Sequence, residues 1–249
     1  MSGHNKWSKI KNVKAKNEAQ TSKLYTKIGR EIAVAVKSGG ADPNSNAKLK
    51  NIIIKARSAN MPNDNITRAI KKASGELGSV NYEAITYEGY GPAGSAVMVY
   101  VLTDNKNRAA SDVRHAFDKF GGSLGANGCV SYLFDRKGLI VVEKGIGISE
   151  DDITMHVLES GADDVEIGDL EYDIYTTPEN FDAVRTYFEN NNIPMVSAEV
   201  TMIPQNYVTL PDDKVATFTK LYDALNDNDD VQEIYHNVEN FGDDDEDEE

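Results

Sequence analysis

Hydrophobic residues in the first third of the chain recur every three or four positions, with charged residues between them. This spacing predicts amphipathic helices that pack as a small bundle. The first helix should begin near Thr21 or Ser22, whose hydroxyl can cap it, and end at Gly39-Gly40. A second helix closes before Pro62, and a third follows it. The hydrophobic faces of the three helices comprise Leu24, Ile28, Ile32, Val36, Leu49, Ile52, Ile53, Ala56, Ile66, Ala69, Ile70 and Ala73.

After Gly75 the spacing changes to a mixture of strand and helix patterns. Tyr82–Tyr90 and Ala96–Thr103 are typical of a hairpin, because a turn sequence rich in glycine and proline separates them. A helix is predicted at about Arg108–Phe120, and a strand at Cys129–Phe134.

The order of elements in residues 136–204 is strand, helix, two strands, helix, strand, which is the ferredoxin-like arrangement. A helix at Pro211–Leu225 and a strand at Val231–Asn237 then complete a second set of similar build, begun by the hairpin. The predicted fold class is therefore α+β, with an N-terminal three-helix bundle that carries a basic arm. Two ferredoxin-like domains follow it, one inserted in the other.

The predicted domain boundaries follow from these changes of pattern. They are 1–78 for the basic arm and helical bundle, 79–135 with 205–242 for a split α+β domain, 136–204 for the inserted domain, and 243–249 for a disordered acidic tail.

Charge is divided unevenly along the chain. Residues 1–75 hold 16 Lys and Arg against four Asp and Glu, a net charge of +12, whereas the rest holds 10 against 37, a net charge of −27. The overall value of −15 would have argued against nucleic acid, but a basic block of this density indicates phosphate binding. The usual interpretation of helix lysines, a solvated surface, is less consistent with a block this basic.

The candidate nucleic-acid-binding residues come from this block. On the first helix, the spacing places Lys23, Lys27 and Arg30 on one stripe. In the arm, Trp7 among lysines suits stacking on an exposed base, although packing against the bundle explains it equally well. The complete set is His4, Lys6, Trp7, Lys9, Lys11, Lys14, Lys16, Lys23, Lys27, Arg30, Lys48, Lys55, Arg57, Arg68, Lys71 and Lys72.

A second contact is predicted at the junction between a strand and a helix, at Asn105, Asn107 and Arg108. Arg108 would project beside a helix N-terminus that can hold a phosphate. The alternative, which we favour, is that an asparagine caps the helix.

Enzymatic chemistry is not indicated by any motif. The four histidines have no metal-ligand spacing, and Cys129 is better explained as a buried strand residue than as a nucleophile. The glycines of residues 121–128 follow a helix and precede a strand, the reverse of a phosphate loop, so they predict a helix end and a turn. We expect no catalytic residue, no metal and no cofactor.

The cellular location is predicted from the absence of membrane-spanning and targeting signals in the sequence. No stretch approaches the length of a membrane span, and the start has neither a secretory h-region nor the composition of a transit peptide. A cytoplasmic protein is predicted.

Several segments together resemble the YebC/PmpR family, over nearly the whole chain. They are Gly3-His4-Asn5-Lys6-Trp7 with Ile10-Lys11, Lys23-Leu24-Tyr25-Thr26-Lys27 with Arg30-Glu31-Ile32, Asn60-Met61-Pro62 with Asn65-Ile66 and Arg68-Ala69-Ile70, Tyr87-Glu88-Gly89-Tyr90-Gly91-Pro92, Leu102-Thr103-Asp104-Asn105-Lys106-Asn107-Arg108, and Asp229-Asp230-Val231-Gln232-Glu233-Ile234-Tyr235. Two positions depart from the family pattern: Cys129 where serine is expected, and Ala93 where glycine is expected.

The resemblance implies three domains and a role in gene expression. Bacterial members are described as DNA-binding transcriptional regulators, whereas a mitochondrial relative activates translation of a cytochrome oxidase subunit. We therefore expect a non-enzymatic regulator that binds DNA. The alternative is a ribosome-associated translation factor that binds ribosomal or transfer RNA, which the charge division favours slightly. The expected partners are nucleic acid and, under the alternative, the ribosome, with no membrane and no small-molecule substrate.

Overall fold

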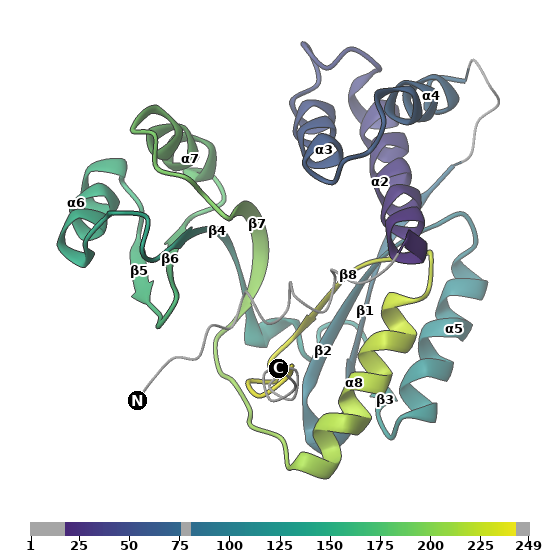
Figure 1. The fold of residues 1–249 in the computed structure, drawn as a ribbon. Helices are drawn as coiled ribbons and strands as arrows, with labels where there is room; N and C mark the ends of the chain where they lie inside the picture. The colour runs from purple at the N-terminus through teal and green to yellow at the C-terminus, as the bar shows by residue number, and fades with distance from the viewer. Residues whose placement is uncertain (1–17, 76–80, 243–249) are drawn as a thin grey trace. The chain divides into compact units, whose positions relative to one another are not determined.

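The computed structural model describes residues 18–75 and 81–242, which form two compact units. One unit contains residues 132–207, and the other contains the helices of the N-terminal part together with residues 81–131 and 208–241. Each unit is an α+β structure built around its own four-stranded antiparallel sheet (Figure 1), so the predicted fold class is confirmed.

The N-terminal helices pack around a hydrophobic core of their own. The helices are α2 (Glu18–Gly39), α3 (Ala47–Ser58) and α4 (Asn63–Ala73). The buried core contains most of the predicted residues, among them Ile28, Ile32 and Ile66. Leu24 was wrongly assigned to this core. Its side chain is 39% exposed, because the packed face of α2 consists of Ile28, Ile32 and the Ala35-Val36 pair.

A single asparagine joins α2 to α3. The side chain of Asn46 accepts a hydrogen bond from the Leu49 amide and donates to the carbonyls of Ala35 and Gly40. It thereby satisfies free backbone groups at the start of α3 and the end of α2 at once.

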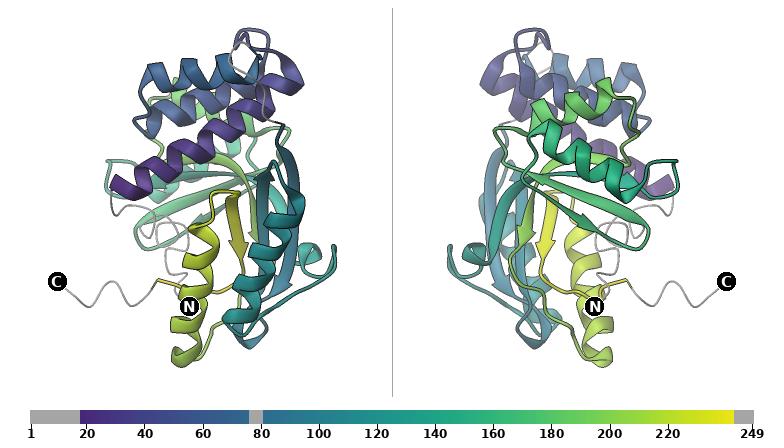
Figure 2. Two further views of the ribbon diagram at one scale, coloured as in Figure 1. Left: turned by 90° about the vertical axis from the view of Figure 1, so that its right-hand side faces the viewer. Right: turned by 90° about the vertical axis from the view of Figure 1, so that its left-hand side faces the viewer.

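The first sheet has the strand order β3-β1-β2-β8, and two helices cover one of its faces (Figure 2, left). Val97, Val99 and Val101 of the central strand pack against those helices. The elements are β1 (Glu83–Tyr90), β2 (Ala96–Thr103), α5 (Lys106–Lys119), β3 (Ser123–Leu124), α8 (Asp212–Asn226) and β8 (Val231–His236).

The turn between β1 and β2 contains one of the two departures from the family pattern. Ala93 has φ 54° and ψ 24°, the left-handed region in which glycine has no steric cost. The structure therefore gives a physical reason for expecting glycine at this position.

The predicted strand at Cys129–Phe134 is wrong. Residues 131–133 form a single 3₁₀ turn, and the next strand begins only at Phe134. The reason is a buried carboxylate. Glu88 accepts hydrogen bonds from the amides of Gly128, Val130 and Ser131, so these amides are satisfied by a side chain and need no neighbouring strand.

The second unit has the strand order β5-β6-β4-β7, the arrangement of a ferredoxin-like fold. Two helices cover one face of this sheet (Figure 2, right). Ser149 and Asp152 form a capping box at the start of the first of them, as the local sequence favours. The elements are β4 (Phe134–Glu143), α6 (Glu150–Ser160), β5 (Asp164–Ile167), β6 (Glu171–Thr176), α7 (Phe181–Asn190) and β7 (Ser197–Pro204).

Gly89 allows β3 to approach β1, and its replacement should be costly. A Cβ atom at Gly89 would lie 2.6 Å from the Ser123 carbonyl oxygen and 2.8 Å from the Phe117 ring. We expect Gly89→Ala to lower the free energy of unfolding by about 1–3 kcal/mol, because the backbone of β3 has to move. In denaturant titrations, the matched variant Gly29→Ala should be neutral or stabilising, since its Cβ meets no atom within 4 Å. Equal effects of both substitutions would contradict this explanation.

Candidate nucleic-acid interface

The three cations predicted on one stripe of α2 form ion pairs or hydrogen bonds with other residues of the protein. Lys23 pairs with Asp227 at 2.7 Å. Lys27, which is 9% exposed, donates to the carbonyl and side-chain oxygens of Asn226 at 3.1 and 3.0 Å. A phosphate at this stripe would therefore compete with groups that already bind these cations.

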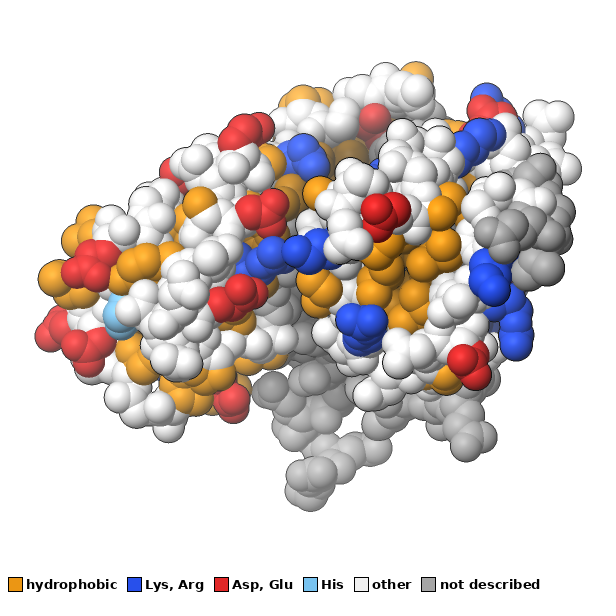
Figure 3. Space-filling model, turned by 90° about the horizontal axis from the view of Figure 1, so that it is seen from above, with side chains coloured by type: hydrophobic (Ala, Val, Ile, Leu, Met, Phe, Trp, Pro, Cys, Tyr) orange, Lys and Arg blue, Asp and Glu red, His pale blue; other side chains and the backbone are white. Residues whose placement is uncertain are grey.

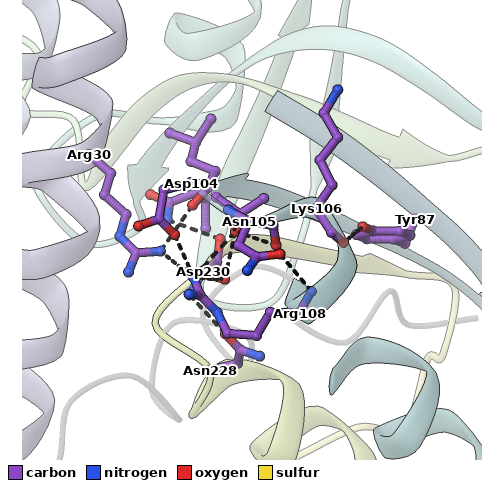
Figure 4. Close-up of polar contacts among 11 residues, drawn as sticks. Arg30, Tyr87, Asp104, Asn105, Lys106, Arg108, Asn228 and Asp230 are labelled. Carbon is purple, nitrogen blue, oxygen red and sulfur yellow. Dashed lines mark hydrogen bonds and ion pairs between the residues drawn. The ribbon is translucent and has the colours of Figure 1, made fainter. Parts of the chain in front are cut away.

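Arg30 belongs to a polar cluster of the same unit that is centred on Asp230 (Figure 4). Its guanidinium pairs with Asp230 and donates to the Leu102 carbonyl at 2.9 Å. Asp230 also accepts hydrogen bonds at 2.8 Å from Arg108 and from the hydroxyl of Thr103. This carboxylate thus joins α2, the end of β2, α5 and the start of β8.

The Asp230 side chain is 5% exposed. Burial alone would raise the pKa of this carboxyl, but the hydrogen bonds from Arg108, Arg30 and Thr103 outweigh burial and hold the pKa below its ordinary value. The group is therefore a charged carboxylate at neutral pH.

The residues of the predicted second contact lie between the end of β2 and the start of α5, where two of them form hydrogen bonds or ion pairs within the protein. Asn105 caps α5, since its side chain accepts from the Arg108 amide at 3.1 Å. The Arg108 guanidinium binds Asp104 and Asp230, and Asn107 is exposed. The favoured capping role is confirmed for Asn105, while nucleic-acid contact at these residues stays a prediction.

Two further cations of the bundle have polar partners. Lys37 donates to the side chain of Asn81. Lys55 lies 2.9 Å from Glu31 and 3.5 Å from Glu233.

The remaining cations on α3 and α4 are exposed, and within the described part of the chain no acid pairs with them. On the face seen in Figure 3, blue Lys and Arg side chains border orange hydrophobic ones over the helical elements. This free set comprises Lys48, Lys50 and Arg57 of α3 and Arg68, Lys71 and Lys72 of α4. These six residues, hereafter the exposed cations, can bind phosphate without breaking an internal ion pair.

A groove of about 450 Å³ lies between α2 and α4. Tyr25, Gly29 and Arg30 line one side, and contacts recur along α2 in steps of three or four residues, at positions 22, 25, 29 and 33. Asn65, Arg68 and Lys72 line the other side with the same spacing along α4, and Tyr82 also lines the groove.

Sequence reasoning missed the uncharged residues of this groove. The hydroxyl of Tyr25 donates to the Asn60 carbonyl at 2.6 Å, and the Arg30 guanidinium lies 5.3 Å from the centre of the Tyr82 ring. A usable signal was the stripe at positions 22, 25, 26, 29 and 33 of α2, which is neither charged nor strongly hydrophobic.

The remaining sequence predictions concern regions outside this interface or outside the described residues. The arm residues His4, Lys6, Trp7, Lys9, Lys11, Lys14 and Lys16 and the acidic tail at 243–249 lie outside the described residues. Cys129 is only partly buried and lies in a bend, so its assignment to a buried strand was wrong. Burial and the neighbouring Glu88 raise the pKa of its thiol, which disfavours a thiolate nucleophile.

No described helix has the length and apolar character of a membrane span. Among the residues of the two units, three or more His, Cys, Asp or Glu side chains nowhere gather as metal ligands.

The fold defines a class of protein: a basic helical bundle with two α+β structures, of which the second has the ferredoxin-like strand order. Comparison with known families is specific. Residues 5–76 match the TACO1/YebC protein N-terminal domain, and residues 82–238 match the TACO1/YebC second and third domain. The chain belongs to the TACO1/YebC family.

Relatives match over almost their full length. The chain is 54% identical over 238 residues to a "probable transcriptional regulatory protein" of Acetivibrio thermocellus, covering 95% of this chain and 98% of that one. It is 54% identical over 240 residues to a similarly named protein of Geobacillus sp., covering 96% and 98%. A crystal structure of the conserved hypothetical protein Aq1575 from Aquifex aeolicus has a TM-score of 0.79 and 45% identity, covering 90% of this chain and 92% of that chain.

Proposed function

We propose that this protein is a non-enzymatic regulator of gene expression that binds nucleic acid through the exposed cations of α3 and α4. The observation that carries the proposal is that these six residues lie on two neighbouring helices and form no ion pair with a described acid. Cations arranged in this way release counterions from a phosphate backbone and bind it with little dependence on sequence.

Duplex DNA is the first candidate target. It is suggested by the names of the relatives, which are probable transcriptional regulatory proteins. Only two of the exposed cations, Arg57 and Arg68, are arginines that could read base edges, and the other four are lysines, which bind phosphates as point charges. We therefore expect phosphate contacts to dominate binding to DNA.

RNA on the ribosome is a second candidate, and the division of charge favours it. Residues after position 75 hold 37 acids against 10 bases. A long duplex would repel so acidic a body, whereas a ribosome offers phosphates to the basic helices and basic proteins to the acidic remainder. In this case the regulated step is translation.

The surface is tested by a double charge reversal that leaves every described ion pair intact. We expect Lys48→Glu with Lys71→Glu to weaken binding roughly tenfold or more and to reduce the slope of log K against log salt by about two. Fluorescence anisotropy with duplex DNA, single-stranded RNA and transfer RNA across a range of salt measures both quantities.

The matched control reverses two exposed cations that likewise pair with no described acid, Arg114→Glu of α5 with Lys220→Glu of α8, with the same change in net charge. Equal losses in both double variants would show a general charge effect and contradict the proposed surface. Sedimentation of the native protein from a lysate, with and without ribonuclease, then decides between the targets. Comigration with ribosomal particles that is lost after ribonuclease supports the translation role, and duplex binding without comigration supports the transcription role.

A further inference from the structure

The groove between α2 and α4 combines three features that a nucleotide-binding site needs. It is concave, and its volume of about 450 Å³ lies within the range of small-ligand sites, about 300–1,000 Å³. Two aromatic side chains, Tyr25 and Tyr82, line it. Both are only partly buried, so part of each side chain is accessible to a ligand.

The charge of the groove is positive. Arg30, Arg68 and Lys72 contribute cations, and among the described residues that line it none is acidic. The positive charge of Arg30 is partly offset by Asp230, whereas Arg68 and Lys72 belong to the exposed cations. An anionic group is therefore favoured on the α4 side of the groove.

The α2 side of the groove is open because of a glycine. A Cβ atom at Gly29 would meet no other atom within 4 Å, so the space above this residue is free. Asn65 and Thr26 lie along the same groove and supply hydrogen-bonding side chains. Flat aromatic contacts, amide and hydroxyl groups, and a cationic side are together suited to a base with an attached phosphate.

We propose that this groove holds one unstacked nucleobase of a single-stranded nucleic acid, with the adjacent phosphate against Arg68 and Lys72. The inference rests on the proposed function, since the exposed cations of α3 and α4 bind the flanking phosphates of the same strand. Duplex DNA could not place a base here without breaking a base pair, so the groove discriminates in favour of single strands.

The test fills the groove while leaving every cation in place. Gly29→Leu puts a branched side chain into the open space and replaces a helical glycine by a good helix former, so the bundle should stay folded. The control is Asn51→Leu, which adds an exposed leucine on α3 outside the groove. The probes are a short oligouridylate, a duplex DNA of similar length and uridine monophosphate.

For Gly29→Leu we expect the affinity for oligouridylate to fall roughly five- to 100-fold, the effect of losing one stacked base. Its salt slope and its affinity for duplex DNA should not change, because the phosphate contacts persist. Asn51→Leu should match the unmodified protein. With 4-thiouridine in the oligonucleotide, photocrosslinks should map to peptides that contain Tyr25 or Tyr82 and disappear in Gly29→Leu.

Three results would overturn the proposal. If Gly29→Leu binds oligouridylate as the unmodified protein does, the groove holds no base. If uridine monophosphate binds as tightly as the oligonucleotide, the site takes free nucleotides and not a strand. If the unmodified protein binds none of the polymers, the proposed function fails with it, and that outcome is distinct because no variant is needed to see it.

Discussion

Replacing Asp230 with alanine is expected to lower the free energy of unfolding by about 3–5 kcal/mol. The carboxylate is 5% exposed and binds Arg30, Arg108 and the hydroxyl of Thr103. Alanine would leave Arg30, whose side chain is 14% exposed, without its carboxylate partner. The cost is large because a mostly buried cation would lose its counter-charge, whereas an exposed pair contributes little.

Denaturant titration measures this loss, and the neighbouring substitution Asp229→Ala provides the control. Asp229 is exposed, so its removal should change the unfolding free energy by at most about 0.5 kcal/mol. The same result for both variants would show that the Asp230 cluster does not stabilise the fold.

The cluster also predicts a dependence on pH. The pKa of Asp230 is lower in the folded protein than its ordinary value of 3.8. Its stabilisation is therefore fully present above that ordinary value and is lost as the pH falls through the folded pKa. The unfolding free energy of the unmodified protein should decrease in this acidic range more steeply than that of Asp230→Ala.

Most of the fold could be predicted from local patterns. The helices and strands of the second unit follow from hydrophobic spacing, and the Ser149–Asp152 capping box is a local signal. The strand predicted at Cys129–Phe134 failed because its amides bind Glu88, about 40 residues earlier in the chain. A contact of that separation leaves no trace in local periodicity.

The candidate site was predictable only as a set of charges. The count of +12 identified the basic bundle, but it did not show which cations are available. Lys23 and Arg30 bind acids about 200 residues later in the chain, at Asp227 and Asp230. Because ion pairs of this kind are tertiary contacts, the sequence could not separate them from free cations such as Lys71.

The polar cluster around Asp230 explains part of the resemblance to the family. Three segments that carried the resemblance, containing Arg30, Arg108 and Asp230, are far apart in sequence and come together in one cluster. Their shared occurrence in a family pattern is thus explained by packing of the bundle against the first sheet. A residue in such a motif therefore need not contact nucleic acid.

Replacing Glu88 with alanine is expected to lower the free energy of unfolding by at least about 3 kcal/mol. Its carboxylate accepts from the amides of Gly128, Val130 and Ser131 at 2.8–3.0 Å and is the acceptor that shapes this loop. Without it, three amides lose their partner, and each hydrogen bond to a charged group contributes about 1.5–3 kcal/mol. Chemical denaturation of Glu88→Ala measures the loss, and hydrogen exchange should show faster exchange at residues 128–131.

The control lies on the same strand. Glu83 is exposed and pairs with Lys106 at the surface, so Glu83→Ala should cost at most about 1 kcal/mol. The two variants should also differ in their dependence on pH. Burial alone would raise the pKa of Glu88, but the three amides outweigh it and hold the pKa below the ordinary value of 4.5.

The stabilisation from Glu88 is consequently complete above pH 4.5 and disappears as the pH falls through the lower folded value. Glu88→Ala should lack this part of the acid sensitivity, and Glu83→Ala should retain it. If instead Glu88→Ala and the unmodified protein lose stability in parallel on acidification, the carboxylate is not the charged acceptor that replaces a strand partner in this loop.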